Sequence, residues 1–265
     1  RSHRGARSRG RDGGTGRLTR LLARQPGDSG VSTESMEPPA NIVLLMTDQH
    51  RVDTIGCYGG AACETPALDA LASAGTRFDA AFTPTAICGP TRASLVTGVL
   101  PFRHGLVANA ELGAGQAREL GDTYPSFAWA LRDVGYRVHH VGKWHVGAKR
   151  GPEAFGFEGV HYDGWENPVE HPTYSAWLAE RGLPPFRLSD EVRLPAHDGK
   201  PGRLLAGIVE QPTEATFDAF LADQAIDQLR DLAETWHTSR QPFYLGVHWF
   251  GPHLPYCIPR EWFER

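Results

Sequence analysis

Residues 41–49 read Asn-Ile-Val-Leu-Leu-Met-Thr-Asp-Gln, an apolar run that ends in polar residues. Such a run is typical of a central parallel strand that is buried on both faces. Similar runs predict two more strands, at residues 136–141 and 242–248. Helical patterns lie between these runs, at residues 65–74, 123–134 and 216–236. Because strands alternate with helices, we expect an α/β fold with a mainly parallel sheet flanked by helices.

The expected helices have typical first and last residues. Thr65 is the expected cap of the first helix, and Pro66 suits its first helical position. Gly135 follows the end of the second helix. The longest helix carries five apolar residues that we expect on its buried face: Phe217, Phe220, Leu221, Ile226 and Leu229. Residues 150–215, rich in glycine, proline and aromatic residues, predict a substrate-side excursion over the strand ends, with one short helix near residues 174–180.

The composition limits the class of protein. Of 265 residues, 40% are hydrophobic and 22% are charged, which is typical of a globular chain. No run reaches the roughly 18 apolar residues of a membrane-spanning helix, so we expect no membrane partner. The formal net charge is −4 although many arginines lie near the N-terminus, and the acidic remainder predicts no nucleic-acid partner. The cysteines are too sparse for a disulfide framework.

Residues 1–38 form an arginine- and glycine-rich stretch with few apolar side chains. This composition predicts a disordered tail, or a misassigned start upstream of a true one near Met36. The stretch lacks the hydrophobic segment of a secretory signal peptide, so we expect a cytoplasmic protein.

The stretch Cys88-Gly-Pro-Thr-Arg92 contains a candidate nucleophile. Pro90 suits the first turn of a helix, which would put Cys88 at or just before the helix N-terminus. The helix dipole and the Arg92 cation would then lower the pKa of the thiol. The alternative for a lone cysteine is a small buried residue without a chemical role.

Polar clusters follow each of the three expected strands. In α/β folds, ligands bind beyond the carboxyl ends of the strands. We therefore expect Asp48-Gln49, Lys143-Trp144-His145 and residues 248–256 to meet at one rim of the sheet. The histidines within or at the ends of strands, His139, His140 and His248, are expected to be hydrogen-bonded structural residues.

Several blocks, in order along residues 41–265, resemble the sulfatase family. They are Asn41–Gly59, the helix from Thr65, Cys-x-Pro-x-Arg followed by Ala-Ser-Leu-x-Thr-Gly from Cys88, Gly142-Lys-Trp-His145, and Pro252-His-Leu-Pro-Tyr256. The resemblance implies an alkaline-phosphatase-like fold in which residues 39–265 are the N-terminal part of a sulfatase domain. It also implies a domain that is incomplete at the C-terminus, because the family's later acidic metal-ligand pair does not follow His253.

The resemblance implies a particular nucleophile and metal. In that family a formylglycine-generating enzyme oxidises the cysteine, here Cys88, to formylglycine, whose hydrate attacks the substrate. Asp48, Gln49 and the residue derived from Cys88 would hold a divalent cation, with calcium favoured over magnesium or manganese. Carboxylate and amide oxygens suit such hard cations.

The resemblance also implies roles for further residues. Arg92 would steady the oxygens of the nucleophile, and His145 would bond its hydroxyl. Lys143 would bind the sulfate, and His253 would lie at the leaving oxygen. Asn109 would be a further substrate contact of the phosphonate-hydrolase branch.

The implied function is the hydrolysis of sulfate esters of a small molecule or a glycan. The pair Asp48-Gln49 stands where Asp-Asp is common, which resembles the branch that contains choline sulfatases and phosphonate monoester hydrolases. Phosphonate monoester or phosphodiester hydrolysis is therefore the alternative. Thr91, where serine is commonest, leaves the conversion of Cys88 to be tested. A third hypothesis is a catalytically incomplete fragment, since two protein ligands are too few for calcium.

Overall fold

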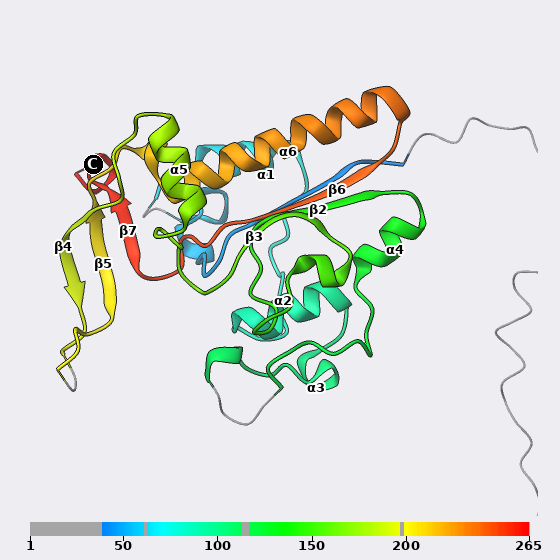
Figure 1. The fold of residues 1–265 in the computed structure, drawn as a ribbon, viewed down its shortest axis with the longest axis horizontal. Coiled ribbons are helices and arrows are strands. Elements are labelled where there is room, and N and C mark those ends of the chain that lie inside the picture. Colours follow the sequence, from blue (N-terminus) through cyan, green and yellow to red (C-terminus); the bar gives the residue numbers. More distant parts are fainter. Residues whose placement is uncertain (1–38, 61–62, 113–116, 197–198, 265) are drawn as a thin grey trace, which may run out of the picture. The chain divides into compact units, whose positions relative to one another are not determined.

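The computed structural model describes residues 39–264, except residues 61–62, 113–116 and 197–198. The predictions for residues 1–38 lie outside the described residues. The described residues contain a four-stranded sheet in the order β1-β6-β2-β3 and a three-stranded sheet in the order β4-β5-β7 (Figure 1).

The four-stranded sheet is parallel throughout. It consists of β1 (Ile42–Met46), β6 (Phe243–His248), β2 (Arg137–Lys143) and β3 (Glu158–Tyr162). Three of these strands confirm the predictions from apolar runs. The sequence did not indicate β3, because its residues Glu-Gly-Val-His-Tyr are mostly polar and form an edge strand.

The prediction that the first strand is buried on both faces is wrong for the described residues. Strands β2 and β6 are buried almost throughout, whereas Ile42, Val43 and Leu45 of β1 are exposed. The physical reason is position, because β1 is an edge of the sheet and β6 and β2 are its two inner strands. An apolar run therefore indicates a strand but not its place in the sheet.

Helices cover both faces of this sheet (Figure 1). Helices α2 (Cys88–Thr97) and α4 (Phe127–Asp133) share one hydrophobic cluster with Val138 of β2. Helix α6 (Phe217–Ser239) shares another cluster with Val141 of β2. Because successive side chains of a strand point to opposite faces, residues 138 and 141 of one strand contribute to the two layers. This layered arrangement is the expected α/β fold.

The long helix α6 corrects one part of the predicted core. Phe217, Phe220 and Leu221 are buried, as expected, but Ile226 and Leu229 are exposed. At about 100° per residue, position 226 lies roughly opposite position 217, so it cannot share its face. The buried face continues instead through two other residues, Ala225 and Leu232.

Capping differs from the prediction at two helices, one of which still begins at its predicted residue, Pro66. Helix α4 begins at Phe127 and not near residue 123, because the Ser126 hydroxyl accepts a hydrogen bond from the Ala128 amide at 3.0 Å. Thr65 does not cap α1 (Pro66–Ala74), and its hydroxyl oxygen instead accepts from the Gly56 amide at 2.8 Å. Both capping contacts depend on which polar neighbours the fold supplies.

The excursion at residues 150–215 has more regular structure than predicted. It contains β3, helix α5 (Pro172–Glu180) and an antiparallel pair, β4 (Leu188–Arg193) with β5 (Leu204–Val209). Strand β5 also pairs in parallel with β7 (Tyr256–Pro259). Residues after the His253 loop are thus joined to the excursion by a second sheet.

Short elements complete the described chain. They are α3 (Pro101–His104), α7 (Arg260–Phe263) and the 3-10 helices η1 (Val52–Thr54), η2 (Gly56–Tyr58), η3 (Ala110–Leu112), η4 (Pro152–Phe155) and η5 (Thr213–Ala215). Among the helices of the described residues, none has the length and apolar character to cross a membrane.

Candidate active site

The carboxyl ends of three strands meet at one rim, as predicted. Asp48 follows β1, Lys143 ends β2 and His248 ends β6. The register places His248 opposite both Met46 of β1 and Gly142 of β2. Parallel pairing therefore brings together polar residues that are about a hundred or more positions apart in sequence.

A buried cluster of charges occupies this rim. The Asp48 Oδ2 atom accepts hydrogen bonds from Arg92 Nη2 at 2.9 Å and from Lys143 Nζ at 3.0 Å. The side chains of Asp48, Arg92 and Lys143 are 9%, 2% and 0% exposed. Burial acts to raise the pKa of Asp48, but the Lys143 and Arg92 cations outweigh it and the pKa is lowered. Burial lowers the pKa of Lys143, with Asp48 acting against it.

Arg92 is held by more than its ion pair. Its Nη1 atom donates to the Lys143 carbonyl at 3.1 Å and to His248 Nδ1 at 3.0 Å. Since an arginine only donates, His248 accepts at Nδ1 and is neutral. The guanidinium on α2 thereby connects the ends of β1, β2 and β6.

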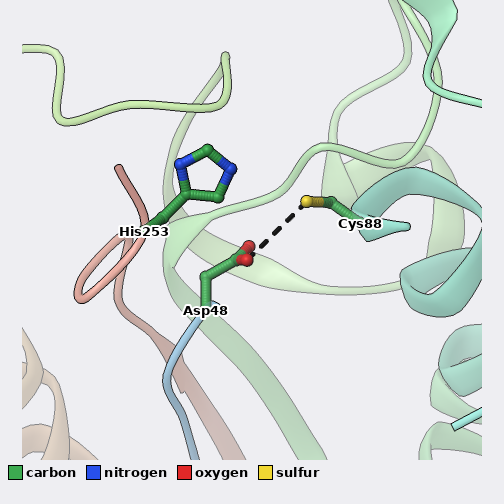
Figure 2. Close-up of side chains that lie close together, drawn as sticks. All are labelled: Asp48, Cys88 and His253. Carbon is green, nitrogen blue, oxygen red and sulfur yellow. Dashed lines mark hydrogen bonds between the residues drawn. The ribbon is translucent and has the colours of Figure 1, made fainter. Parts of the chain in front are cut away.

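Cys88 is the first residue of α2 and faces this cluster. Its Sγ atom lies 3.6 Å from Asp48 Oδ1 (Figure 2). Burial and the Asp48 carboxylate raise the pKa of the Cys88 thiol, although Lys143 and Arg92 act to lower it. The predicted lowering of the pKa is wrong, because helix position and Arg92 are outweighed by lost water and the nearby carboxylate.

Asn109 holds the first turn of α2. Its Oδ1 atom accepts a hydrogen bond from the Gly89 amide at 2.8 Å. A Cβ atom added at Gly89 would lie 3.0 Å from the same oxygen, so the close approach favours glycine. The structure thus places Asn109 beside the nucleophile, and its predicted contact with substrate stays a prediction.

The Thr91 hydroxyl forms hydrogen bonds to the segment that precedes α2. Its Oγ1 donates to the Thr85 carbonyl and lies 2.9 Å from the Thr83 hydroxyl. These bonds attach α2 to the segment before it. Threonine and serine have the same hydrogen-bonding group, so the departure from serine leaves this arrangement intact.

His145 follows β2 and pairs with a residue that the sequence analysis missed. Its Nε2 atom lies 2.9 Å from Glu111 Oε1, and its buried Nδ1 has no hydrogen-bond partner among the described residues. Burial lowers the pKa of His145, and Glu111 acts against that shift. Glu111 lies in η3, two residues after Asn109. A lone glutamate in a loop has no pattern that would single it out.

His253 lies beside Asp48 and Cys88. The three residues offer ligand atoms within 4.8 Å of one another, and Figure 2 shows the Asp48 and Cys88 side chains pointing toward each other with the His253 ring nearby. The His253 Nδ1–H donates to the Leu254 carbonyl at 2.6 Å, which leaves Nε2 as the second ring nitrogen available at the site. The predicted catalytic histidine is thus near the predicted nucleophile.

Gln49 connects the end of β1 to the His253 loop. Its Oε1 atom accepts a hydrogen bond from the Leu254 amide at 3.1 Å, and its backbone is left-handed, with φ 56°. The amide oxygen that was expected to bind metal is therefore engaged with the loop, and its metal role stays a prediction.

The residues of the site provide part of a metal site. Asp48, Cys88 and His253 together offer one oxygen, one sulfur and one nitrogen ligand. Calcium takes about six to eight oxygens, so this set does not complete a calcium shell. Oxidation of Cys88 to formylglycine would replace the sulfur by oxygen, which suits a hard cation better.

The strand histidines are only partly hydrogen-bonded. The Nε2 atoms of His140 and His248 are buried without a hydrogen-bond partner among the described residues. Their rings lie 4.7 Å apart, edge to face. Burial lowers the pKa of His140 to about 3 and that of His248 well below its usual value. Both are neutral packing groups behind Arg92, so the expectation of full hydrogen bonding is wrong for these atoms.

A cavity of about 900 Å³ adjoins the site, and His253 is one of its lining residues. Trp165, also in the lining, links the cavity to the charges at the rim. Its carbonyl accepts a hydrogen bond from Lys143 Nζ at 2.9 Å, and its ring centroid lies 5.7 Å from that of His253. The sequence analysis did not identify Trp165 as a functional residue.

Comparisons with known proteins agree with this arrangement. The Sulfatase family model matches residues 40–263. Human arylsulfatase A is 36% identical over 242 residues, covering 86% of this chain and 44% of that protein. Rat N-acetylgalactosamine-6-sulfatase is 30% identical over 248 residues, covering 88% of this chain and 43% of that protein. A solved phosphonate monoester hydrolase from Silicibacter pomeroyi is 26% identical with a TM-score of 0.58, covering 84% and 43% of the two chains.

The chain therefore spans less than half the length of each of these relatives. The fold is the predicted alkaline-phosphatase-like α/β fold, with a parallel sheet flanked by helices. The family model covers almost all of the described residues. This chain belongs to the sulfatase family.

Proposed function

We propose that this chain provides the nucleophile and anion-binding groups of an enzyme that hydrolyses sulfate esters through a formylglycine derived from Cys88. One observation carries the proposal. Cys88 Sγ lies 3.6 Å from an Asp48 carboxylate that is bound to the two buried cations Arg92 and Lys143. A raised thiol pKa makes direct attack by a thiolate unfavourable, which favours a modified cysteine.

The cations suit the charge that develops during sulfate ester cleavage. Arg92 and Lys143 are fixed by hydrogen bonds before substrate arrives, so little reorganisation is needed. Lys143 is shared between Asp48 and the Trp165 carbonyl, which directs its ammonium toward the rim. A sulfate group at the rim would compete with the Asp48 carboxylate for these two cations.

Two histidines can move the protons of the reaction. His253, with Nδ1–H bonded to the Leu254 carbonyl, would act through Nε2 at the leaving oxygen. Glu111 at His145 Nε2 favours the tautomer whose Nδ1 accepts, and this atom would take a hydroxyl proton. Formylglycine, once formed, supplies as its hydrate one hydroxyl for attack on sulfur and a second whose deprotonation releases sulfate. Asp48 would be one ligand of the divalent cation that the family typically uses.

The first test is the mass of the peptide containing Cys88, from full-length protein made in cells that contain the converting enzyme. Conversion to formylglycine should lower its mass by about 18 Da. The converted protein should release the phenol from an aryl sulfate. Cys88→Ala should abolish release, whereas Cys63→Ala, which changes an exposed cysteine, should not. A retained thiol with full aryl sulfatase activity would contradict the proposal.

Phosphonate monoester hydrolysis is the second candidate function. It is favoured by the structural similarity to the phosphonate monoester hydrolase, together with the Asp48-Gln49 pair. An aryl phosphonate monoester and an aryl sulfate with the same phenol should be compared on one preparation. A higher kcat/KM on the phosphonate would select this second function.

A further inference from the structure

We infer that the cavity beside His253 binds the leaving group of the substrate and selects one that donates hydrogen bonds and has no negative charge. The inference rests on the proposed function and adds a substrate class to it. The cavity touches the site directly, because its lining residue His253 lies with Asp48 and Cys88 around one point. A leaving group whose oxygen reaches His253 would extend into this cavity.

The charge of the lining is one-sided. Among the described residues that line the cavity, four are acidic: Asp163, Glu166, Glu170 and Asp218. None of the described lining residues is a lysine or an arginine, and the basic groups are His171 and His253. Arg203 lies outside the lining, 4.3 Å from the centroid of the Trp165 ring. The rim thus binds an anion while the adjoining cavity repels one.

Two buried side-chain oxygens also belong to residues of the lining. Asp218 Oδ1 and Asn167 Oδ1 are buried without a hydrogen-bond partner among the described residues. Each belongs to a residue that lines the cavity. The exposed lining carboxylates of Glu166 and Glu170 can accept hydrogen bonds from a hydroxyl or ammonium group of a ligand.

Aromatic side chains form another part of the lining. Trp165, Phe217, Phe250 and Trp262 all line the cavity. Aromatic faces suit the apolar ring of a phenol or a sugar and also attract cations. A compact ring that carries hydroxyl or amino groups therefore matches both the acceptors and the walls. A leaving group with carboxylates or additional sulfates does not.

The test uses three aryl sulfates whose para substituents are similar in size but differ in charge and in hydrogen-bond donors. The substituents are aminoethyl, hydroxyethyl and carboxymethyl, and the enzyme is the full-length protein with converted Cys88. We expect kcat/KM to fall in that order, by about tenfold between the ammonium and carboxylate esters. The ratio should shrink as salt is raised, because the charges are partly exposed.

A pair of conservative variants assigns the selectivity to the lining. Glu166 and Glu170 are exposed and form no ion pair within the described residues, so Glu166→Gln with Glu170→Gln should fold normally. We expect the ammonium-to-carboxylate ratio to fall to about threefold or less. The matched control is Asp227→Asn with Glu234→Gln, an equal change of charge on α6 outside this cavity, which should leave the ratio unchanged.

The outcomes separate this inference from the proposed function. Hydrolysis of all three esters at similar rates, or fastest for the carboxylate, would overturn the cavity's selectivity and leave the sulfatase reaction standing. If no ester is hydrolysed despite converted Cys88, the proposed function fails. The cavity is then tested by calorimetric binding of the three free phenols, where equal or tighter binding of the carboxylate would overturn the inference.

Discussion

At the scale of single residues, Asp48 is the counter-charge of both buried cations of the site. It accepts hydrogen bonds from Arg92 and Lys143, and all three side chains are buried. Removing one partner of a buried ion pair is far more costly than never having had the pair, because the remaining charge stays buried. The stability of the site therefore depends on one carboxylate.

Asp48→Asn should lower the free energy of unfolding by about 3–5 kcal/mol, since it leaves two buried cations without a counter-charge. Urea unfolding at pH 7 measures the change. The control Asp53→Asn breaks an exposed ion pair with Arg51 and should have little effect. Because the pKa of Asp48 is lowered, its contribution is present above the unfolded pKa of about 3.9 and is lost as the pH falls through the folded value. Equal stability of the two variants would contradict the prediction.

Glu111 is predicted to position His145. Glu111→Gln removes a carboxylate that raises the pKa of His145, so the pKa of the imidazole should fall further below its usual value. Loss of a charge-assisted hydrogen bond should reduce kcat/KM on an aryl sulfate about tenfold. The imidazole titration followed by NMR distinguishes positioning from a general loss of structure. Glu234→Gln on α6 is the control, and an unchanged titration in Glu111→Gln would refute the role.

At the scale of elements, the second-last residue of β2, Gly142, decides how closely β2 and β6 approach at the rim. Gly142 has φ 102°, and a Cβ atom added there would lie 2.1 Å from the His248 carbonyl of β6. Only glycine adopts this backbone conformation without strain and without that clash. The strand pairing that brings Lys143 to Asp48 therefore requires a residue without a side chain at position 142.

Gly142→Ala should destabilise the fold by about 2 kcal/mol or more, because it adds a clash to a strained φ. It should also lower activity, since Lys143 is the next residue. Thermal unfolding and aryl sulfate turnover measure the two effects. Gly121→Ala places a Cβ atom in open space and should change neither. A stable, active Gly142→Ala protein would contradict the prediction, because β2 and β6 would then have moved apart at little cost.

At the scale of the whole molecule, buried neutral histidines make the fold sensitive to acid. Burial lowers the pKa of His140 to about 3, whereas an unfolded histidine titrates near 6.5. Below about pH 6.5 the unfolded chain therefore binds a proton that the folded chain does not, and stability falls as the pH falls. His248 acts in the same direction.

The replacement His140→Phe should remove one proton from this pH dependence, or about 1.4 kcal/mol per pH unit between pH 6.5 and 3. Phenylalanine keeps the edge-to-face contacts of His140 with Trp144 and Phe157. Chemical unfolding at several pH values gives the slope. His237→Phe, a change at an exposed residue of α6, is the comparison. Identical slopes for His140→Phe and the unchanged protein would argue against the proton linkage.

Much of the fold and site could be predicted because the signals are local. Apolar runs indicated β1, β2 and β6, and polar residues directly after them indicated the rim. The motif around Cys88 indicated the start of α2. Glu111 and Trp165 could not be predicted, because each contributes through a contact made only after folding. The exposed edge at β1 and the second sheet also depend on strand order, which no local pattern specifies.

The sequence by itself determined the strands β1, β2 and β6 with helices between them, the identity of the charged residues at the rim and membership in the sulfatase family. Only the tertiary structure decided the burial, the contacts and the pKa shifts of those residues. It buried the Cys88 thiol and placed the Asp48 carboxylate 3.6 Å from it, and both effects raise the thiol pKa against the expectation from the helix start. The physical reason is that a motif specifies which groups are present, whereas burial and distance between remote segments set their energies.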